Sequence, residues 1–134
     1  MGIDYGRRRI GLALSDDEGL IARGLGVIDR QKAPDHINEL LRIIESEKPS
    51  AIIFGLPLGA DDEETVMSRE VREFAQIIAD KSGMPVRFTD ESFTSKKAAE
   101  LMMHRKKKAR RDKSLSDRIA ACLILQGYID TKST

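Results

Sequence analysis

The chain has 134 residues, of which 40% are hydrophobic and 34% are charged, and its formal net charge is +1. This length and composition predict one soluble globular domain spanning residues 1–134. No apolar run is long enough to cross a bilayer and no signal peptide is visible, so we expect a cytoplasmic protein. The single cysteine, Cys122, excludes an intrachain disulfide, suits a reducing compartment and is expected to be a small core residue.

The N-terminal part of the chain predicts three strands joined by short connections. Apolar segments at 2–5, 9–15 and 20–28 predict these strands, and their tight connections favour an antiparallel meander. Gly24 and Gly26 weaken the third strand or allow a bulge in it. The other expected elements are a helix between Pro34 and Pro49, a strand at 51–55, a helix at about 65–82, a strand at 86–90, and helices at about 94–104 and 115–129.

This order of elements predicts the fold class. An antiparallel meander that leads into two crossover units forms a mixed five-stranded sheet. Helices then cover both faces of the sheet, as in an α/β protein. We see no internal repeat and no linker between domains.

Three acids far apart in the sequence occupy comparable places in the expected elements. Asp4 lies in the first strand, Glu91 ends the fifth strand, and Asp117 begins the last helix. Because open α/β sheets bind ligands at the carboxyl ends of their strands, these acids can lie on one side of the molecule. Clustered carboxylates repel one another unless cations lie among them. Oxygen ligands without cysteine or histidine favour Mg²⁺ or Mn²⁺, and two such ions, about 3.5–4 Å apart, can act on a phosphodiester.

Each acid also has a structural interpretation. Asp4 could pair with an arginine of the adjacent Arg7-Arg8-Arg9 turn, since an acid in an apolar strand needs a compensating charge. Asp117 follows Ser114 by three residues, as in a capping box. Against that interpretation, the apolar spacing that follows Asp117 turns its side chain toward the sheet. Glu91 could be an exposed residue at a strand end, with Asp90 beside it as a decoy.

Two groups of cationic residues adjoin these acids. We expect them to contact a nucleic-acid backbone, which gives affinity with little sequence preference and a steep dependence on salt. The alternative is a solvated loop without a partner. Thr94 could bind a phosphate or cap the helix that follows it. The candidate nucleic-acid-binding residues are Arg7, Arg8, Arg9, Thr94, Arg105, Lys106, Lys107, Lys108, Arg110 and Arg111.

Four motifs, in this order along the chain, resemble the YqgF family. They are Gly-Ile-Asp-Tyr-Gly-Arg-Arg-Arg-Ile-Gly-Leu-Ala-Leu-Ser-Asp (2–16), Gly-Leu-Pro-Leu (55–58), Asp-Glu-Ser-Phe-Thr-Ser (90–95) and Asp-Arg-Ile-Ala-Ala-Cys-Leu-Ile-Leu-Gln-Gly-Tyr (117–128). The family consists of bacterial proteins similar to Holliday-junction resolvases and regarded as candidate nucleases for the 5′ end of pre-16S rRNA. The resemblance implies a ribonuclease H-like fold with strand order 3-2-1-4-5, and it implies that Asp4, Glu91 and Asp117 bind metal.

The chain departs from the family pattern after the fifth strand, where Ser92 and Phe93 replace the usual arginine and leucine. The end of the fourth strand carries Gly55 and no acid. We therefore expect Glu91 to reach past Gly55 toward the first strand, roughly 10 Å away. The function implied is a metal-dependent endonuclease acting on structured RNA, as a monomer or homodimer. The alternatives are a resolvase of branched DNA and a non-catalytic nucleic-acid-binding module.

Overall fold

The structure is a computed structural model, and it describes residues 1–90 and 113–132 of the chain. A five-stranded sheet with the order β3-β2-β1-β4-β5 forms its centre. Strand β1 lies in the middle, antiparallel to β2 and parallel to β4. The strands are β1 (Gly2–Asp4), β2 (Arg9–Ser15), β3 (Ala22–Asp29), β4 (Ile52–Leu56) and β5 (Val86–Asp90). The predicted mixed sheet and its strand order are confirmed.

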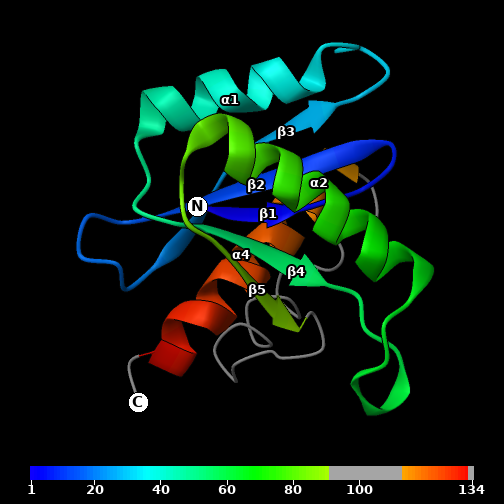
Figure 1. Cartoon of the computed structure of the whole chain (residues 1–134). Coiled ribbons are helices and arrows are strands. Elements are labelled where there is room, and N and C mark those ends of the chain that lie inside the picture. Colours follow the sequence, from blue (N-terminus) through cyan, green and yellow to red (C-terminus); the bar gives the residue numbers. More distant parts are fainter. Residues whose placement is uncertain (91–112, 133–134) are drawn as a thin grey trace.

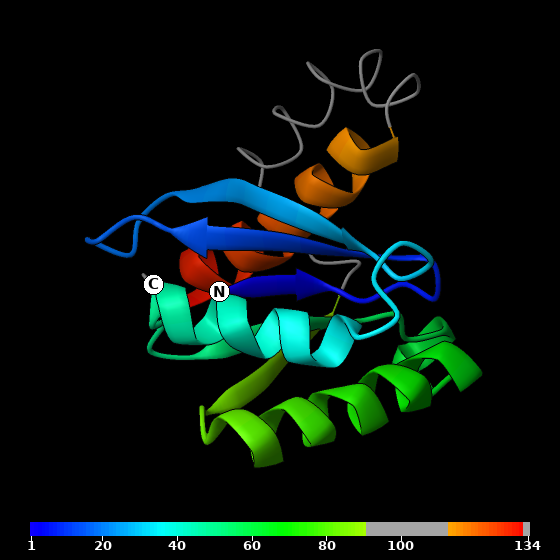
Figure 2. The same ribbon diagram turned by 90° about the horizontal axis from the view of Figure 1, so that it is seen from above.

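Helices cover both faces of this sheet, as the sequence predicts (Figure 2). Helices α1 (His36–Glu47) and α2 (Val66–Ser82) lie on one face, and α4 (Lys113–Lys132) lies on the other. A short 3-10 helix, η1 (Ala60–Asp62), follows β4. Figure 1 shows α4 passing behind the sheet, across the strands that α1 and α2 cover from the front.

The boundaries differ from the prediction at a few places. The third strand begins at Ala22, because the Asp16 carboxylate accepts hydrogen bonds from the Leu20 and Ile21 amides at 2.7 and 3.3 Å and holds them in a turn. The predicted bulge is present, since Leu12 pairs with Gly26 and Ala13 pairs with Gly24. The last helix runs from Lys113 to Lys132 and is longer than expected at both ends. The helix predicted at 94–104 lies outside the described residues.

The two faces of the sheet carry apolar clusters of different character. The face under α1 and α2 is built from large side chains, with Ile3, Leu12 and Phe54 almost fully buried. The face under α4 is built around Ala13, Ile53 and the helix's own Ala121, Ile124 and Leu125. Cys122 belongs to this second cluster and is buried, which confirms its expected place in the core. No helix among the described residues is both long enough and apolar enough to cross a membrane.

Helix α4 approaches the sheet closely because glycines face it. A Cβ atom added to Gly2 would lie 2.7 Å from Cβ of Leu125, and one added to Gly11 would lie 2.2 Å from the carbonyl oxygen of Asp117. Real Cβ atoms essentially never show such distances, so the helix can occupy this position only while both residues lack a side chain. At Gly2 the backbone of the helix itself comes close, since a Cβ atom there would lie 2.9 Å from the carbonyl oxygen of Ala121.

This contact predicts that the substitution Gly11→Ala moves the N-terminal part of α4 away from β2. Overpacking of this kind costs about 1–3 kcal/mol of unfolding free energy. Urea unfolding followed by circular dichroism measures the loss. Gly26→Ala is the matched control, since a Cβ there would meet no atom within 4 Å. Equal stability of the two variants would contradict the close packing described here.

Candidate metal-binding site

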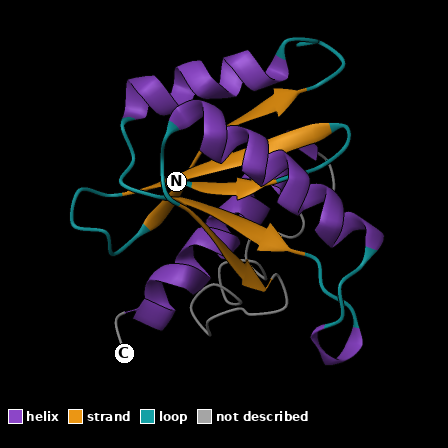
Figure 3. Cartoon of the chain, in the orientation of Figure 1, coloured by secondary structure: helices purple, strands orange, loops and turns teal. Residues whose placement is uncertain are grey.

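Asp4 ends the central strand on the face that α4 covers. Gly2 faces α4, Ile3 belongs to the cluster under α1 and α2, and the alternation of a strand returns Asp4 to the α4 face. The arrowheads of β1, β4 and β5 lie at the same end of the sheet (Figure 3). Asp4 therefore lies at the carboxyl ends of the parallel strands, where the sequence predicts the site.

Asp117 reaches the same place from the last helix. Asp4 is the cross-strand partner of Gly11, and Gly11 lies against Asp117, whose Cβ would be 3.4 Å from a Cβ atom built on the glycine. Directly opposed residues of an antiparallel pair point to the same face, so the two acids lie on either side of Gly11. The structure thus brings together two of the three acids that the sequence predicts.

The capping-box interpretation of Asp117 does not fit the observed helix. Helix α4 begins at Lys113, so Ser114 lies inside it and not at its N-cap. The Asp117 carboxylate instead accepts a hydrogen bond from Nε of Arg9, at 2.6 Å from its Oδ2. The predicted orientation of Asp117 toward the sheet is confirmed.

The third acid, Glu91, lies outside the described residues, as does any contact that it makes. The described part of its surroundings is the end of β5. Thr89 pairs with Gly55, and Asp90 pairs with Leu56, which belongs to the cluster under α1 and α2. Gly55 itself is buried. By strand alternation, Asp90 falls on the face opposite to Asp4.

The chemistry of the two described acids fits a hard divalent cation. Both offer carboxylate oxygens, which Mg²⁺ and Mn²⁺ prefer. One of them, Asp117, already holds a cationic group against Oδ2 in this structure. Across the described ranges, no group of three or more histidine, cysteine, aspartate or glutamate residues is placed to hold a metal ion. A site with three acids therefore depends on a residue beyond Asp90.

The three arginines that follow Asp4 point to different partners. Arg7 pairs with Glu70 of α2 at 3.1 Å, and Arg8 lies 3.6 Å from Asp29 at the end of β3. Both are exposed, at 65% and 52% of their side-chain surface. Burial raises the pKa of Asp29, but the Gln31 amide and the Arg8 guanidinium outweigh it and hold that pKa below its usual value.

Arg9 differs from its two neighbours because it faces the site. Its side chain and that of Asp117 are each only 24% exposed. From the sequence, Arg9 is grouped with the nucleic-acid-binding residues, and an arginine of its turn is considered as a partner of Asp4 but not of Asp117. The signal was present in the strand alternation, which puts Arg9 on the same face of β2 as Gly11. Thr94 and the cationic residues from Arg105 to Arg111 lie outside the described residues.

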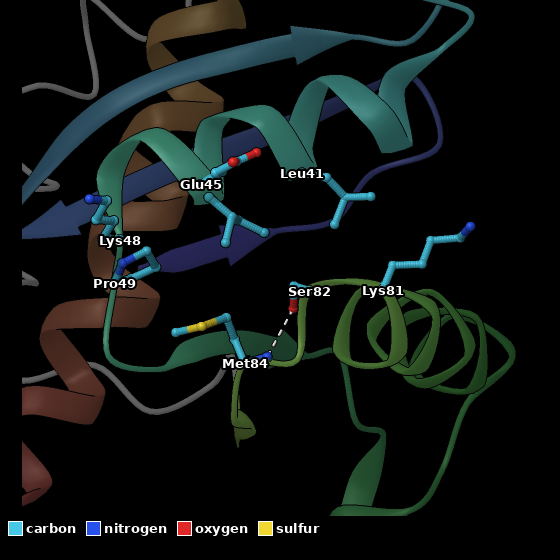
Figure 4. Close-up of a pocket in the computed structure, with 8 residues that line it drawn as sticks. Leu41, Glu45, Lys48, Pro49, Lys81, Ser82 and Met84 are labelled. Carbon is cyan, nitrogen blue, oxygen red and sulfur yellow. Dashed lines mark hydrogen bonds between the residues drawn. The ribbon is translucent and has the colours of Figure 1, made fainter.

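A shallow apolar groove lies far from these acids, between the C-terminal ends of α1 and α2 (Figure 4). Its residues precede β4 and β5, so it lies at the opposite end of the strands from Asp4. Leu41, Ile44 and Met84 line it, together with the charged residues Lys48 and Lys81. The amide of Met84 donates a hydrogen bond to Oγ of Ser82 beside it.

Comparison with known proteins identifies relatives over the whole chain. The family model described as "RuvX: Holliday junction resolvase" matches residues 1–131. A protein of Thermosynechococcus vestitus is 36% identical over 133 residues, which cover 99% of this chain and 88% of the relative. One of Crocosphaera subtropica is 34% identical over 132 residues, 98% of this chain and 92% of the relative. Each bears the name "Putative pre-16S rRNA nuclease".

Solved structures show the same fold. Thermus thermophilus RuvC in complex with a Holliday junction substrate has a TM-score of 0.63 at 20% identity, covering 99% of this chain and 95% of that one. The Fowlpox virus resolvase bound to Holliday junction DNA has a TM-score of 0.57 at 14% identity, covering 99% of this chain and 97% of that one. The expected ribonuclease H-like fold is confirmed. The chain belongs to the RuvX family of Holliday junction resolvases, which is the YqgF family that its motifs resemble.

Proposed function

We propose that this chain is a metal-dependent endonuclease that hydrolyses phosphodiester bonds. The observation that carries the proposal is the meeting of Asp4 and Asp117 on either side of Gly11, at the carboxyl ends of the central strands. The two acids come from opposite ends of the sequence, and neither is needed by the apolar clusters on the two faces. Membership of a resolvase family adds independent support.

We assign Asp4, Glu91 and Asp117 as the ligands of Mg²⁺ or Mn²⁺. The neighbouring acid Asp90 is a poorer candidate, because it shares its face of the sheet with Leu56, opposite to the face of Asp4. A divalent ion held by carboxylates polarises a phosphoryl oxygen and makes water a stronger nucleophile at neutral pH. The chain's own part is to bring the acids together and to hold them at fixed positions.

The substrate that we favour is the 5′ end of pre-16S rRNA, in the cytoplasm. The names of relatives at 34–36% identity support it, because those relatives match nearly the whole chain. A Holliday junction is the second candidate, favoured by the description of the family and by the junction DNA in the solved structures of similar fold. A non-catalytic binding module is the third, and it would not require the paired acids.

We propose that exposed cations beside the acids bind the sugar–phosphate backbone. Arg7 and Arg8 lie in the turn that follows Asp4 and Tyr5, and their side chains are more than half exposed. Among the residues beyond Asp90, we assign the same role to Thr94, Arg105, Lys106, Lys107, Lys108, Arg110 and Arg111, six of which are cationic residues that precede Asp117. Backbone contacts of this kind position a nucleic acid and carry no sequence information directly.

The acids are tested by Asp4→Asn and Asp117→Asn, which keep the shape of the side chain and remove its charge. Each is expected to lower Mn²⁺-dependent cleavage of a pre-16S rRNA fragment by at least about 100-fold, since loss even of an outer-shell partner of a metal ligand costs about 10–100-fold. Cleavage is followed on denaturing gels with an end-labelled RNA, and a Holliday junction is tested in parallel.

Asp90→Asn is the matched control for these two variants. It removes the same charge at the same end of the sheet, but on the opposite face, so cleavage should stay near that of the unsubstituted chain. Full activity in Asp4→Asn or Asp117→Asn would contradict the assigned site. RNA binding without cleavage in any divalent metal would favour the binding module.

The cationic residues are tested by the salt dependence of binding. Replacing Lys106, Lys107 and Lys108 with glutamine should weaken binding of the RNA fragment and reduce the slope of log affinity against log salt by about two to three, at roughly 0.7–0.9 for each phosphate contact. Fluorescence anisotropy of labelled RNA measures it. Lys48→Gln with Lys81→Gln, in the groove of Figure 4, is the control pair and should leave the slope unchanged.

A further inference from the structure

Arg9 forms an ion pair with one of the two described acids of the site. Its Nε lies 2.6 Å from Oδ2 of Asp117, and three-quarters of each side chain is covered, since each is 24% exposed. The pairs made by Arg7 and Arg8 are longer and their arginines are more than half exposed. Because a pair withdrawn from solvent is screened less, the Arg9 pair holds its acid more firmly than the other two.

The fold directs Arg9 to this position. Arg9 begins β2 and shares its α4-facing side with Gly11, and Gly11 is the residue on which Asp117 rests. The Arg9 guanidinium therefore approaches the Asp117 carboxylate from the sheet. Arg9 lies two residues before Gly11, where helix α4 contacts β2. Arginine cannot be deprotonated in a protein, so this cation is present at every pH at which the chain is folded.

The Arg9 guanidinium lies where two negative charges come close together around Gly11. Asp4 and Asp117 lie on either side of that glycine, and two nearby negative charges repel each other. Without a divalent ion, a fixed positive group at Asp117 offsets the repulsion. When the ion is present, the guanidinium and the ion are both attracted to the same carboxylate and repel each other.

We propose that Arg9 is a positioning residue that holds Asp117 while no divalent ion is bound, and that the ion replaces its guanidinium at Oδ2. This inference rests on the proposed metal-dependent function. The acid is kept turned toward the sheet before the ion arrives, and breaking the pair is part of the cost of loading. The apparent metal affinity is therefore lower than the intrinsic affinity by the fraction of molecules in which the carboxylate is released.

The test is a Mn²⁺ titration of the whole chain by isothermal calorimetry, after bound metal has been removed with a chelator. Arg9→Gln removes the competing cation and should bind Mn²⁺ at least about fivefold more tightly, which is the lower range of coupling between linked equilibria. Thermal unfolding in chelator gives a second readout that does not depend on activity. The variant should unfold at a lower temperature than the unsubstituted chain, and saturating Mn²⁺ should abolish that difference.

Two further variants separate competition from a general effect of charge. Arg8→Gln removes the same charge one residue away, at a side chain that pairs with Asp29, and should leave the Mn²⁺ affinity within about twofold. Arg9→Lys keeps the charge without the rigid geometry of the guanidinium, and its affinity should lie between those of Arg9→Gln and the unsubstituted chain.

The outcomes distinguish this inference from the proposed function. Unchanged or weaker Mn²⁺ binding by Arg9→Gln, with clear binding by the unsubstituted chain, overturns the role of Arg9 and leaves the metal site standing. Absence of Mn²⁺ binding by the unsubstituted chain overturns both. If Arg9→Gln folds only when Mn²⁺ is present, the inference is supported; if it fails to fold in either condition, Arg9 is a structural residue and the inference fails.

Discussion

The site depends on the close contact between helix α4 and the two central strands. Only glycine at positions 2 and 11 permits it, because a side chain at either would collide with the helix. The same contact that buries Ala121 and Leu125 against the sheet also places Asp117 on Gly11 of β2, which is the cross-strand partner of Asp4. The interface between α4 and the sheet therefore serves both core packing and the placement of the acids. A substitution that loosens α4 is expected to move Asp117 away from Asp4.

The two faces of the sheet contribute differently to stability and to the site. Large aliphatic and aromatic side chains under α1 and α2 supply most of the buried apolar surface, and burial of such surface is the main stabilising contribution to folding. On the α4 face, Gly2, Gly11 and Ala13 lie in the strands under the helix, which lets its backbone come near them. Acids are costly next to an apolar cluster. They are placed at the end of the strands, where water and a cationic side chain can reach them.

Much of this arrangement could be predicted from the residues. The apolar run of Ile52 to Leu56 and the periodicity of α2 predict a parallel crossover. The apolar spacing that follows Asp117 in its helix predicts that this acid faces the sheet. The pairing of Arg9 with Asp117 was missed, because strand alternation indicates the face of Arg9 only once β2 is known to begin there, with Arg7 and Arg8 in the turn before it. The start of β3 was also missed, since hydrogen bonds from Leu20 and Ile21 to Asp16 override their apolar character.

The distance along the chain between the parts of the site has a consequence for biosynthesis. Arg9 and Asp117, which meet in the folded protein, are separated by 108 positions. A ribosome adds about 5–20 residues each second, so the sheet strands leave the exit tunnel seconds before the helix that completes the site. During that interval the nascent polypeptide carries one acid without the other. On the assignment of the acids proposed above, the site stays incomplete until α4 has emerged and docked against the sheet.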